Sequence, residues 1–250
     1  MENSEFGLPD NTRSDDQAWR YLKRHSWQLL AGLIGLALVV EYISLPLGEI
    51  ELLKKAIPTE TAFMHEQAER ARSEGRPFSK VQIVVPYDSI PKNVVNAVVV
   101  AEDGTFWSHD GFDWFEFRES FLRNLREFRV VRGASTITQQ LAKNLYLSSS
   151  KNPFRKLNEW ILTWKMEKTL SKARILELYL NTIEWGDGVY GVGAAAQFYF
   201  QKSVPELTRE EAARLAAVIP NPRRYRADAP SRYILQRTTM ILGRMAARGL

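Results

Sequence analysis

The chain has 250 residues, of which 45% are hydrophobic and 25% charged, so it can bury one substantial core or two small lobes and is not a disordered chain. Its formal charge of +5 and its pI near 9.4 favour an anionic partner, with nucleic acid, anionic lipid and a phosphorylated substrate all left open. Cysteine is absent, which excludes disulfides, thiolate zinc sites and cysteine nucleophiles, and the three scattered histidines argue against a histidine metal site.

The N-terminal quarter predicts a polar tail at residues 1–25 and a membrane anchor at residues 26–48. The apolar run from Trp27 to Leu47 has about the 20 residues needed to cross the hydrocarbon core. Glu41 would cost about 2.5–3.5 kcal/mol at the centre of an inserting helix, but it lies beyond the midpoint, and the many Leu, Ile and Val residues offset that cost. The alternative is a cleaved signal peptide, although no small-x-small cleavage site follows the run. More basic residues precede the run than follow it, which favours a cytoplasmic N-terminus.

Beyond the anchor the chain is predicted to be mostly helical. Apolar residues recur with the 3.6-residue period of a buried helical face over residues 156–181, with a break near Ser171. Thr208 begins a capping box of the Thr-x-x-Glu type, which predicts a helix that runs through residues 212–219 and stops at Pro220. No linker divides residues 49–250, so we expect one catalytic domain there.

An acidic pair, Glu102 and Asp103, ends an apolar run and is followed by a glycine-punctuated loop that carries Phe106 and His109. Such surroundings can hold a carboxylate with a perturbed pKa, as acid–base chemistry on a sugar requires. The preceding segment, residues 93–101, is rich in valine and by propensity alone would be a buried strand.

A second polar group follows about 25 residues later. On a helix, Thr136, Gln140 and Lys143 would share one face, while Ile137 and the leucines that follow it would line a buried one. An ordinary amphipathic helix capped by Ser135 or Thr136 explains the same pattern equally well.

A third group consists of Arg155, Lys156 and Glu159, which one turn of helix brings together so that two cations and a carboxylate converge. From the sequence alone, a surface ion pair is the simpler interpretation.

These three groups resemble, in order, the first three signature motifs of the family 51 glycosyltransferases, the peptidoglycan polymerases: Glu-Asp-x-x-Phe-x-x-His-x-Gly, Gly-x-Ser-x-x-x-Gln-Gln and Arg-Lys-x-x-Glu. Residues 175–196 and 213–222 resemble the fourth and fifth motifs. The similarity covers roughly residues 55–226, and five ordered motifs are far more specific than any one of them. The resemblance is to a monofunctional member, for which we expect no transpeptidase domain.

The resemblance implies a mainly α, lysozyme-like domain in which residues 93–101 form a helix that delivers the acidic pair. It implies transfer of a glycan from undecaprenyl diphosphate to the GlcNAc 4-hydroxyl of lipid II, with inversion to a β-1,4 link. Glu102 is the expected general base, and Glu159 is expected to position the donor or a divalent cation, Mg²⁺ or Mn²⁺, on the substrate diphosphate. No organic cofactor is expected. Expected substrate-binding residues are Asp103, Phe106, His109, Ser135, Thr136, Gln139, Gln140, Lys143, Asn144, Arg155 and Lys156.

The resemblance also implies a small lobe facing the membrane, for which residues 112–131 are the candidates. An apolar stripe there (Phe117, Phe121, Leu125, Phe128) runs beside four arginines (Arg118, Arg123, Arg126, Arg129). This combination suits an anionic bilayer surface, and a core-facing helix with a solvated basic side fits it as well. We expect an inner-membrane enzyme with a periplasmic catalytic domain, whose partners are lipid II, the lipid-linked glycan and cell-wall synthesis or division proteins, but no nucleic acid.

Two other classes of function compete with this interpretation. A muramidase or lytic transglycosylase would share the fold and a catalytic glutamate, but it would have no need of the cations Lys143, Arg155 and Lys156. A membrane-tethered scaffold without activity would have no need to keep both Glu102 and Glu159.

Overall fold

The computed structural model describes residues 12–127, 135–147, 153–229 and 231–250. The chain divides into two units, Met1–Leu45 and Pro46–Leu250. In the first unit, α1 (Thr12–Ser44) is a continuous helix, and most of its large apolar side chains from Trp27 onward are exposed. Among the described residues, one segment, Arg24–Lys54, is long and apolar enough to cross a membrane, because it contains an 18-residue stretch with a mean hydropathy of 2.0. Its length and composition are consistent with a single-pass anchor.

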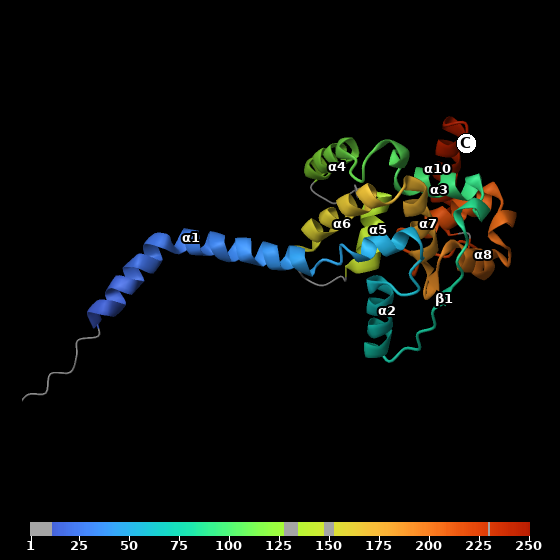
Figure 1. Ribbon diagram of the computed structural model, residues 1–250. Coiled ribbons are helices and arrows are strands. Elements are labelled where there is room, and N and C mark those ends of the chain that lie inside the picture. Colours follow the sequence, from blue (N-terminus) through green and yellow to red (C-terminus); the bar gives the residue numbers. More distant parts are fainter. Residues whose placement is uncertain (1–11, 128–134, 148–152, 230) are drawn as a thin grey trace, which may run out of the picture. The chain divides into compact units, whose positions relative to one another are not determined.

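The second unit is mainly α-helical, as predicted, and also contains a small sheet (Figure 1). Its α-helices are α2 (Ala62–Ser73), α3 (Lys92–Glu102), α4 (Trp114–Glu127), α5 (Ile137–Tyr146), α6 (Arg155–Thr169), α7 (Lys172–Thr182), α8 (Val192–Phe200), α9 (Arg209–Val218) and α10 (Arg232–Ala247). Short 3-10 turns are η1 (Glu49–Lys54), η2 (Tyr87–Ser89), η3 (Phe106–Ser108) and η4 (Val204–Glu206). The strands are β1 (Val81–Gln82), β2 (Glu184–Gly186) and β3 (Val189–Tyr190).

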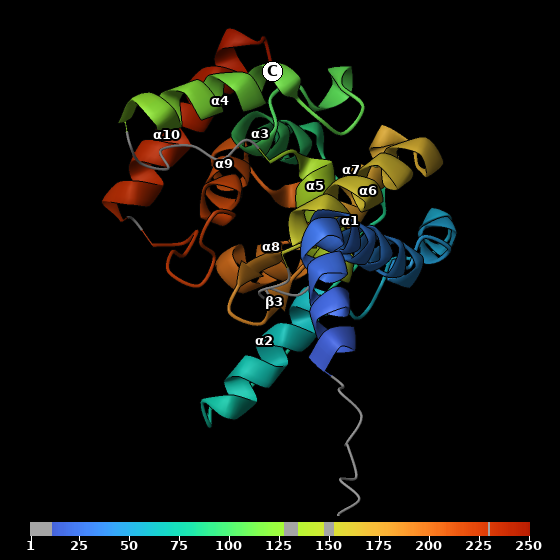
Figure 2. The ribbon, with the colours of Figure 1, turned by 90° about the vertical axis from the view of Figure 1, so that its left-hand side faces the viewer.

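Two groups of helices build the core. α3 packs against α9 and α10, and α5 packs against α6, α7 and α2 (Figure 2). The helices meet through fully buried side chains, among them Val94 and Val98 on α3, Leu141 on α5 and Leu176 on α7. A hydrogen bond links the two groups. Asp103, directly after α3, accepts it from the backbone N–H of Ile137, the first residue of α5, so the two helix ends lie close together.

The small sheet has the strand order β1-β3-β2. β1 pairs in parallel with β3, with Val81 opposite Val189, and β2 is antiparallel to β3, with Glu184 opposite Tyr190. All residues of β2 and β3 are buried. The sheet packs against α8, which begins directly after β3.

The predicted helix boundaries are confirmed. Ser171 separates α6 from α7, and its hydroxyl accepts the N–H of Arg174 as the N-cap of α7. Thr208 forms the expected capping box at the start of α9, whose apolar side chains from Ala212 to Val218 are buried. Both caps satisfy N–H groups that have no partner within their own helix.

α3 is a helix despite its run of valines. Pro91 precedes its first residue, and six of its side chains are buried, including five valines. β-branched residues lower helix propensity only slightly, so burial against α9 and α10 decides the conformation. The helix implied by the family resemblance is correct, and the strand suggested by propensity is wrong.

The segment proposed to face a membrane is described in part. α4 is a helix, and Trp114, Phe115 and Phe117 on its first turn are exposed, at 63%, 72% and 44%. Phe128 and Arg129 lie outside the described residues, as do Arg132 and Gly133 of the second motif, and the side chains of Phe121, Arg123, Leu125 and Arg126 are not described.

Candidate active site

Glu102 is the last residue of α3, and both of its carboxylate oxygens accept hydrogen bonds. Arg237 on α10 donates from Nη2 to Oε1 over 3.0 Å, and Gln140 on α5 donates from Nε2 to Oε2 over 3.1 Å. The Glu102 side chain is 10% exposed. Each carboxylate oxygen offers about two acceptor positions, so each keeps one for a substrate.

The amide of Gln140 is oriented by a buried phenol. The hydroxyl of Tyr179 donates to Oε1 of Gln140 over 2.9 Å, which turns the amide nitrogen towards Glu102. Burial raises the pKa of Tyr179 well above its usual value, and the nearby carboxylates of Glu102 and Asp103 raise it further. Tyr179 therefore stays protonated and acts as a donor throughout the neutral range.

Burial raises the pKa of Glu102, as the sequence predicted, because removal from water disfavours the charged carboxylate. The hydrogen bond from Gln140 and the positive charge of Arg237 oppose this shift, and the charge of Asp103 adds to it. The result is a carboxyl group whose raised pKa suits it to accept a proton from a weakly acidic hydroxyl.

Asp103 organises the loop that follows Glu102. Its carboxylate accepts from the Ile137 N–H over 2.9 Å and lies 3.0 Å from Nε2 of His109. The other ring nitrogen of His109 accepts from the backbone N–H of Gly111, so the imidazole carries its proton on Nε2 and donates it to Asp103. These contacts fix the loop after Glu102 onto the start of α5.

Gly111 lets the loop pass closely over α6. It has a positive φ of 87°, and a Cβ there would lie 2.8 Å from side-chain carbons of Thr163 and Glu167. Glu167 is itself fixed, because Thr138 donates to it over 2.5 Å and Lys172 pairs with it over 2.9 Å. The last glycine of the first motif is thus required by packing and backbone conformation.

Two residues of the second motif form the N-terminal cap of α5. Thr136 and Gln139 make a reciprocal capping box, and the Thr136 hydroxyl also donates to the carbonyl of Gly111 over 2.7 Å. Both side chains are buried. Their contacts position the helix that carries Gln140 and Lys143.

The third motif forms the expected cluster on the first turns of α6. The Glu159 side chain is 5% exposed and pairs with Nζ of Lys156 and, over 3.7 Å, with Nη1 of Arg155. The two cations are more exposed than the carboxylate, at 47% and 36%. Glu159 therefore orients two cations that remain accessible to an anionic ligand.

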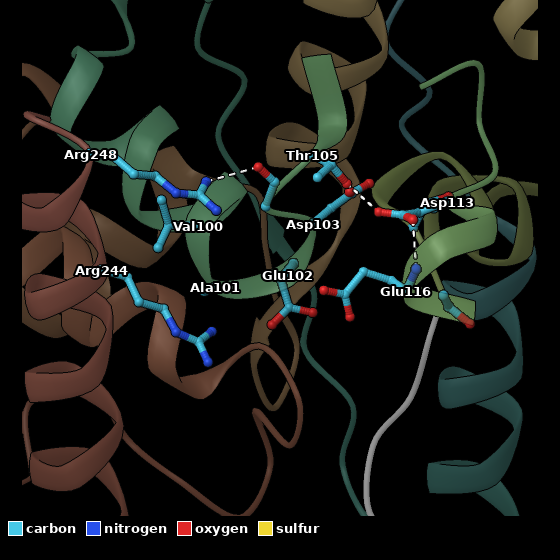
Figure 3. A pocket seen from close by; sticks show the side chains of 12 residues that line it. Val100, Ala101, Glu102, Asp103, Thr105, Asp113, Glu116, Arg244 and Arg248 are labelled. Atoms are coloured by element: carbon cyan, nitrogen blue, oxygen red, sulfur yellow. Dashed lines mark hydrogen bonds between the residues drawn. The ribbon is translucent and has the colours of Figure 1, made fainter. Parts of the chain in front are cut away.

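A cavity of about 290 Å³ opens beside Glu102 (Figure 3). Its twelve lining residues come from the end of α3 and the following loop, from the start of α4 and α5, and from the end of α10. The lining residues are Val100, Ala101, Glu102, Asp103, Gly104, Thr105, Asp113, Glu116, Ser135, Thr136, Arg244 and Arg248. The figure shows the side chains of Glu102, Glu116 and Arg244 directed into it.

The predicted site residues fall into groups of different accessibility. Asp103, Phe106, Thr136, Gln139 and Glu159 are buried, and Phe106 lies in the core beneath Lys172. The exposed ones are Ser135, Lys143 and Lys156, whereas Glu102, His109, Gln140, Asn144 and Arg155 are intermediate. Of these residues, Glu102, Asp103, Ser135 and Thr136 line the cavity, whereas the cations Lys143, Arg155 and Lys156 do not.

The sequence analysis missed three arginines in and directly after α10: Arg237, which contacts Glu102, and Arg244 and Arg248, which line the cavity. Their spacing of seven and four residues keeps them near one helix face, which was the available signal. In the part of the chain that the structure describes, no group of three or more His, Asp or Glu side chains could hold a metal ion.

Comparison with known proteins gives one consistent result. The profile of the family described as Transglycosylase matches residues 70–246. The chain is similar to the biosynthetic peptidoglycan transglycosylase of Nitrosospira multiformis, with 39% identity over 92% of this chain and 99% of that protein. It is similar to proteins of the same name from Chromobacterium violaceum (40% identity, 90% and 98% covered) and Dechloromonas aromatica (43%, 88% and 94%).

Proposed function

We propose a substrate and a mechanism for this chain from the premise that it belongs to the transglycosylase family and is a peptidoglycan glycosyltransferase of cell-wall synthesis. Its catalytic domain is of the lysozyme-like, mainly α type, its substrates are lipid-linked glycans, and it associates with the membrane. The proposal is that it polymerises lipid II into β-1,4-linked strands, by inverting transfer from an undecaprenyl-diphosphate-linked donor to the GlcNAc 4-hydroxyl of lipid II.

Glu102 acts as the general base in this proposal. A sugar hydroxyl is a poor nucleophile, so its proton must be removed as the new bond to the anomeric carbon forms. The main support is that both oxygens of Glu102 are held, by Arg237 and Gln140, at the edge of a cavity large enough for a sugar. The raised pKa of Glu102 lies closer to neutral pH than that of an ordinary carboxyl group, which makes Glu102 a stronger base.

The leaving diphosphate needs charge neutralisation rather than protonation, because it is already a weak base. We assign this role to Lys143, Arg155 and Lys156, with Glu159 as the residue that orients the last two. A hydrolase would need a protonated acid at this position, so the cluster favours a transferase over a muramidase.

A divalent cation has a limited place in the proposal. Glu159 supplies one carboxylate, and Lys156 and Arg155 already pair with it, so the described residues do not by themselves form a resident metal site. Mg²⁺ or Mn²⁺ would bind as a companion of the substrate diphosphate. The steps assigned to Glu102 and to the cations do not depend on it.

We further propose a single-pass protein of the bacterial inner membrane, with a cytoplasmic N-terminus and a periplasmic catalytic domain.

A second membrane contact is supported by an aromatic surface formed by Phe112, Trp114, Phe115, Phe117 and Trp160. Phe112 stacks on Trp114 with ring centres 5.7 Å apart and meets Trp160 edge to face at 6.2 Å. Exposed aromatic rings at this density suit the interface of a bilayer. Association with other cell-wall synthesis or division proteins remains a prediction.

The test is incubation of the purified full-length chain with lipid II, followed by analysis of the products before and after muramidase digestion. Long glycan strands that muramidase shortens would support the proposal. Unchanged lipid II, under conditions in which a known polymerase consumes it, would refute it.

A further inference from the structure

The C-terminal half of α10 forms one wall of the cavity beside Glu102. Arg244 and Arg248 lie one helical turn apart, and both line the cavity. Arg237, two turns earlier, reaches Glu102 itself. α10 and the residue that caps its C-terminal end therefore contribute three guanidinium groups to the surroundings of the proposed base.

The opposite wall is acidic. Asp113 and Glu116, at the start of α4, line the cavity together with Glu102, and Asp113 is held by Thr105 and by the backbone N–H of Glu116. Figure 3 shows the carboxylates of Glu102 and Glu116 and the guanidinium of Arg244 directed towards the same space. The cavity is thus polarised, with negative charge on one side and positive charge on the other.

The two arginines of the cavity differ in what holds them. Arg248 donates from Nη1 to the carbonyl of Gly104 over 2.8 Å, and a Cβ at Gly104 would lie 2.7 Å from its Nη2. Arg248 is therefore part of the local fold. Arg244 is exposed and makes no hydrogen bond or ion pair within the described ranges of the chain, although its guanidinium is directed into the cavity.

The cavity also differs from the cation cluster assigned to the donor. Its described lining does not include Lys143, Arg155 or Lys156. A general base must contact the hydroxyl that it deprotonates, and this hydroxyl belongs to the acceptor. The cavity lies beside Glu102 and is not lined by the three cations assigned to the donor, so it suits the acceptor.

We propose that Arg244 binds an anionic group of the acceptor substrate, a phosphate or a carboxylate, and thereby orients the acceptor hydroxyl towards Glu102. This inference rests on the proposed function and adds an acceptor subsite to it. The polarity of the cavity supports this orientation, because the acidic wall repels an anion but accepts hydrogen bonds from neutral sugar hydroxyls. An acceptor that places its anionic end on α10 leaves its hydroxyl end on the side of Glu102 and Glu116.

The test compares Arg244→Gln with Arg232→Gln in the full-length chain. Arg232 is an exposed arginine on the same helix and does not line the cavity, so its loss controls for net charge. Arg244→Gln should raise the KM for lipid II by roughly ten- to hundred-fold, the range expected for a lost charge-assisted contact, with a much smaller change in kcat. Arg232→Gln should leave both constants within about two-fold of the wild type.

Two further measurements show whether Arg244 serves the acceptor or the donor, and which anionic group it binds. Affinity for moenomycin, a mimic of the donor, should be unchanged in Arg244→Gln, and thermal unfolding should show an intact fold. With lipid II that lacks its peptide, a KM penalty that persists identifies the diphosphate as the group bound by Arg244. A penalty that disappears identifies a peptide carboxylate.

The inference would be overturned by a KM for Arg244→Gln within two-fold of the wild type, or by a parallel loss of moenomycin affinity. Failure of the proposed function would look different. In that case the wild-type chain would not polymerise lipid II at all, whereas failure of the subsite alone would leave wild-type polymerisation intact.

Discussion

Nη2 of Arg237 lies 3.0 Å from Oε1 of Glu102, although the two residues are 135 positions apart in the chain. The Arg237 side chain is 21% exposed, and its Nε is buried and has no hydrogen-bond partner within the described part of the chain. A buried polar atom without a partner lowers the free energy of unfolding, so stability alone does not account for Arg237 at this position. It holds the carboxylate in one orientation and counteracts the effect of burial on its pKa.

The first prediction concerns the pH dependence that this contact produces. Burial raises the pKa of Glu102 and the charge of Arg237 lowers it, so Arg237→Met should raise that pKa further. Because the base must be ionised, the acid limb of the profile of kcat/KM against pH should move to higher pH. Activity lost at neutral pH should then be partly regained at alkaline pH.

Arg237→Lys retains the charge and should show a smaller shift of the acid limb than Arg237→Met. The matched control is Arg232→Met on the same helix, for which the profile should not move. An acid limb that stays in place in Arg237→Met, with activity uniformly reduced at every pH, would show that the arginine does not act through the ionisation of Glu102.

A second prediction separates the role of Asp103 from that of Glu102, the proposed base. Asp103→Ala leaves the N–H of Ile137 and Nε2 of His109 without their acceptor, and Asp103 is buried. The free energy of unfolding should fall by roughly 2–4 kcal/mol, since each unsatisfied buried donor costs about 1–3 kcal/mol. Chemical denaturation of the full-length chain measures this loss. Asp110→Ala, at an exposed position of the same loop, should change it by less than about 0.5 kcal/mol.

The sequence predicted the local structure around Glu102 well, because the residues that determine this structure are neighbours in the chain. The position of Glu102 follows from a motif whose other members, Asp103, His109 and Gly111, hold the loop in place. Helix boundaries at Ser171 and Thr208 follow from local capping chemistry. Such features could be predicted because the interacting groups lie within a few residues of one another.

Longer-range relationships could not be derived in this way. The valine-rich α3 is helical because of its packing against α9 and α10, which its own residues do not specify. A motif also does not distinguish a residue that contacts substrate from one that supports it: Thr136 and Gln139 form a buried cap. Arg237 and Arg244 were missed because nothing in the sequence of α10 indicates that it meets the end of α3.

The third prediction tests the donor cations. Lys143→Gln and Arg155→Gln should each weaken the binding of moenomycin by roughly 1–3 kcal/mol, because each removes a charge-assisted contact with phosphate. Lys168→Gln, at an exposed lysine on α6, is the control and should bind as the wild type does. Competition binding with a labelled inhibitor measures all three. If both cluster variants bound normally, the phosphate site would have to be placed elsewhere.

The fourth prediction concerns the membrane. Removal of residues 1–48 should reduce activity on bilayer-embedded lipid II more than on detergent-solubilised lipid II, because the anchor raises the local concentration of enzyme at the bilayer. The truncated chain should retain some affinity for anionic vesicles through the aromatic surface. In that background, Phe115→Ser should weaken sedimentation with vesicles, whereas Leu235→Ser, an exposed leucine on α10, should not. Equal losses of activity in both substrate formats would argue against a membrane-docking role.

The last prediction distinguishes the roles of the two glutamates. Glu102→Gln keeps the size of the side chain but cannot accept a proton, so polymerisation should fall at least a hundred- to ten-thousand-fold with moenomycin binding and fold intact. Added Mg²⁺ or Mn²⁺ should not restore it. Glu159→Gln removes the anion that orients Arg155 and Lys156, so its defect should include weaker moenomycin binding and an altered dependence on divalent cations. Near-normal polymerisation by Glu102→Gln, together with an inactive Glu159→Gln that binds moenomycin normally, would mean that Glu159 is the base and that the assignment of the two carboxylates must be reversed.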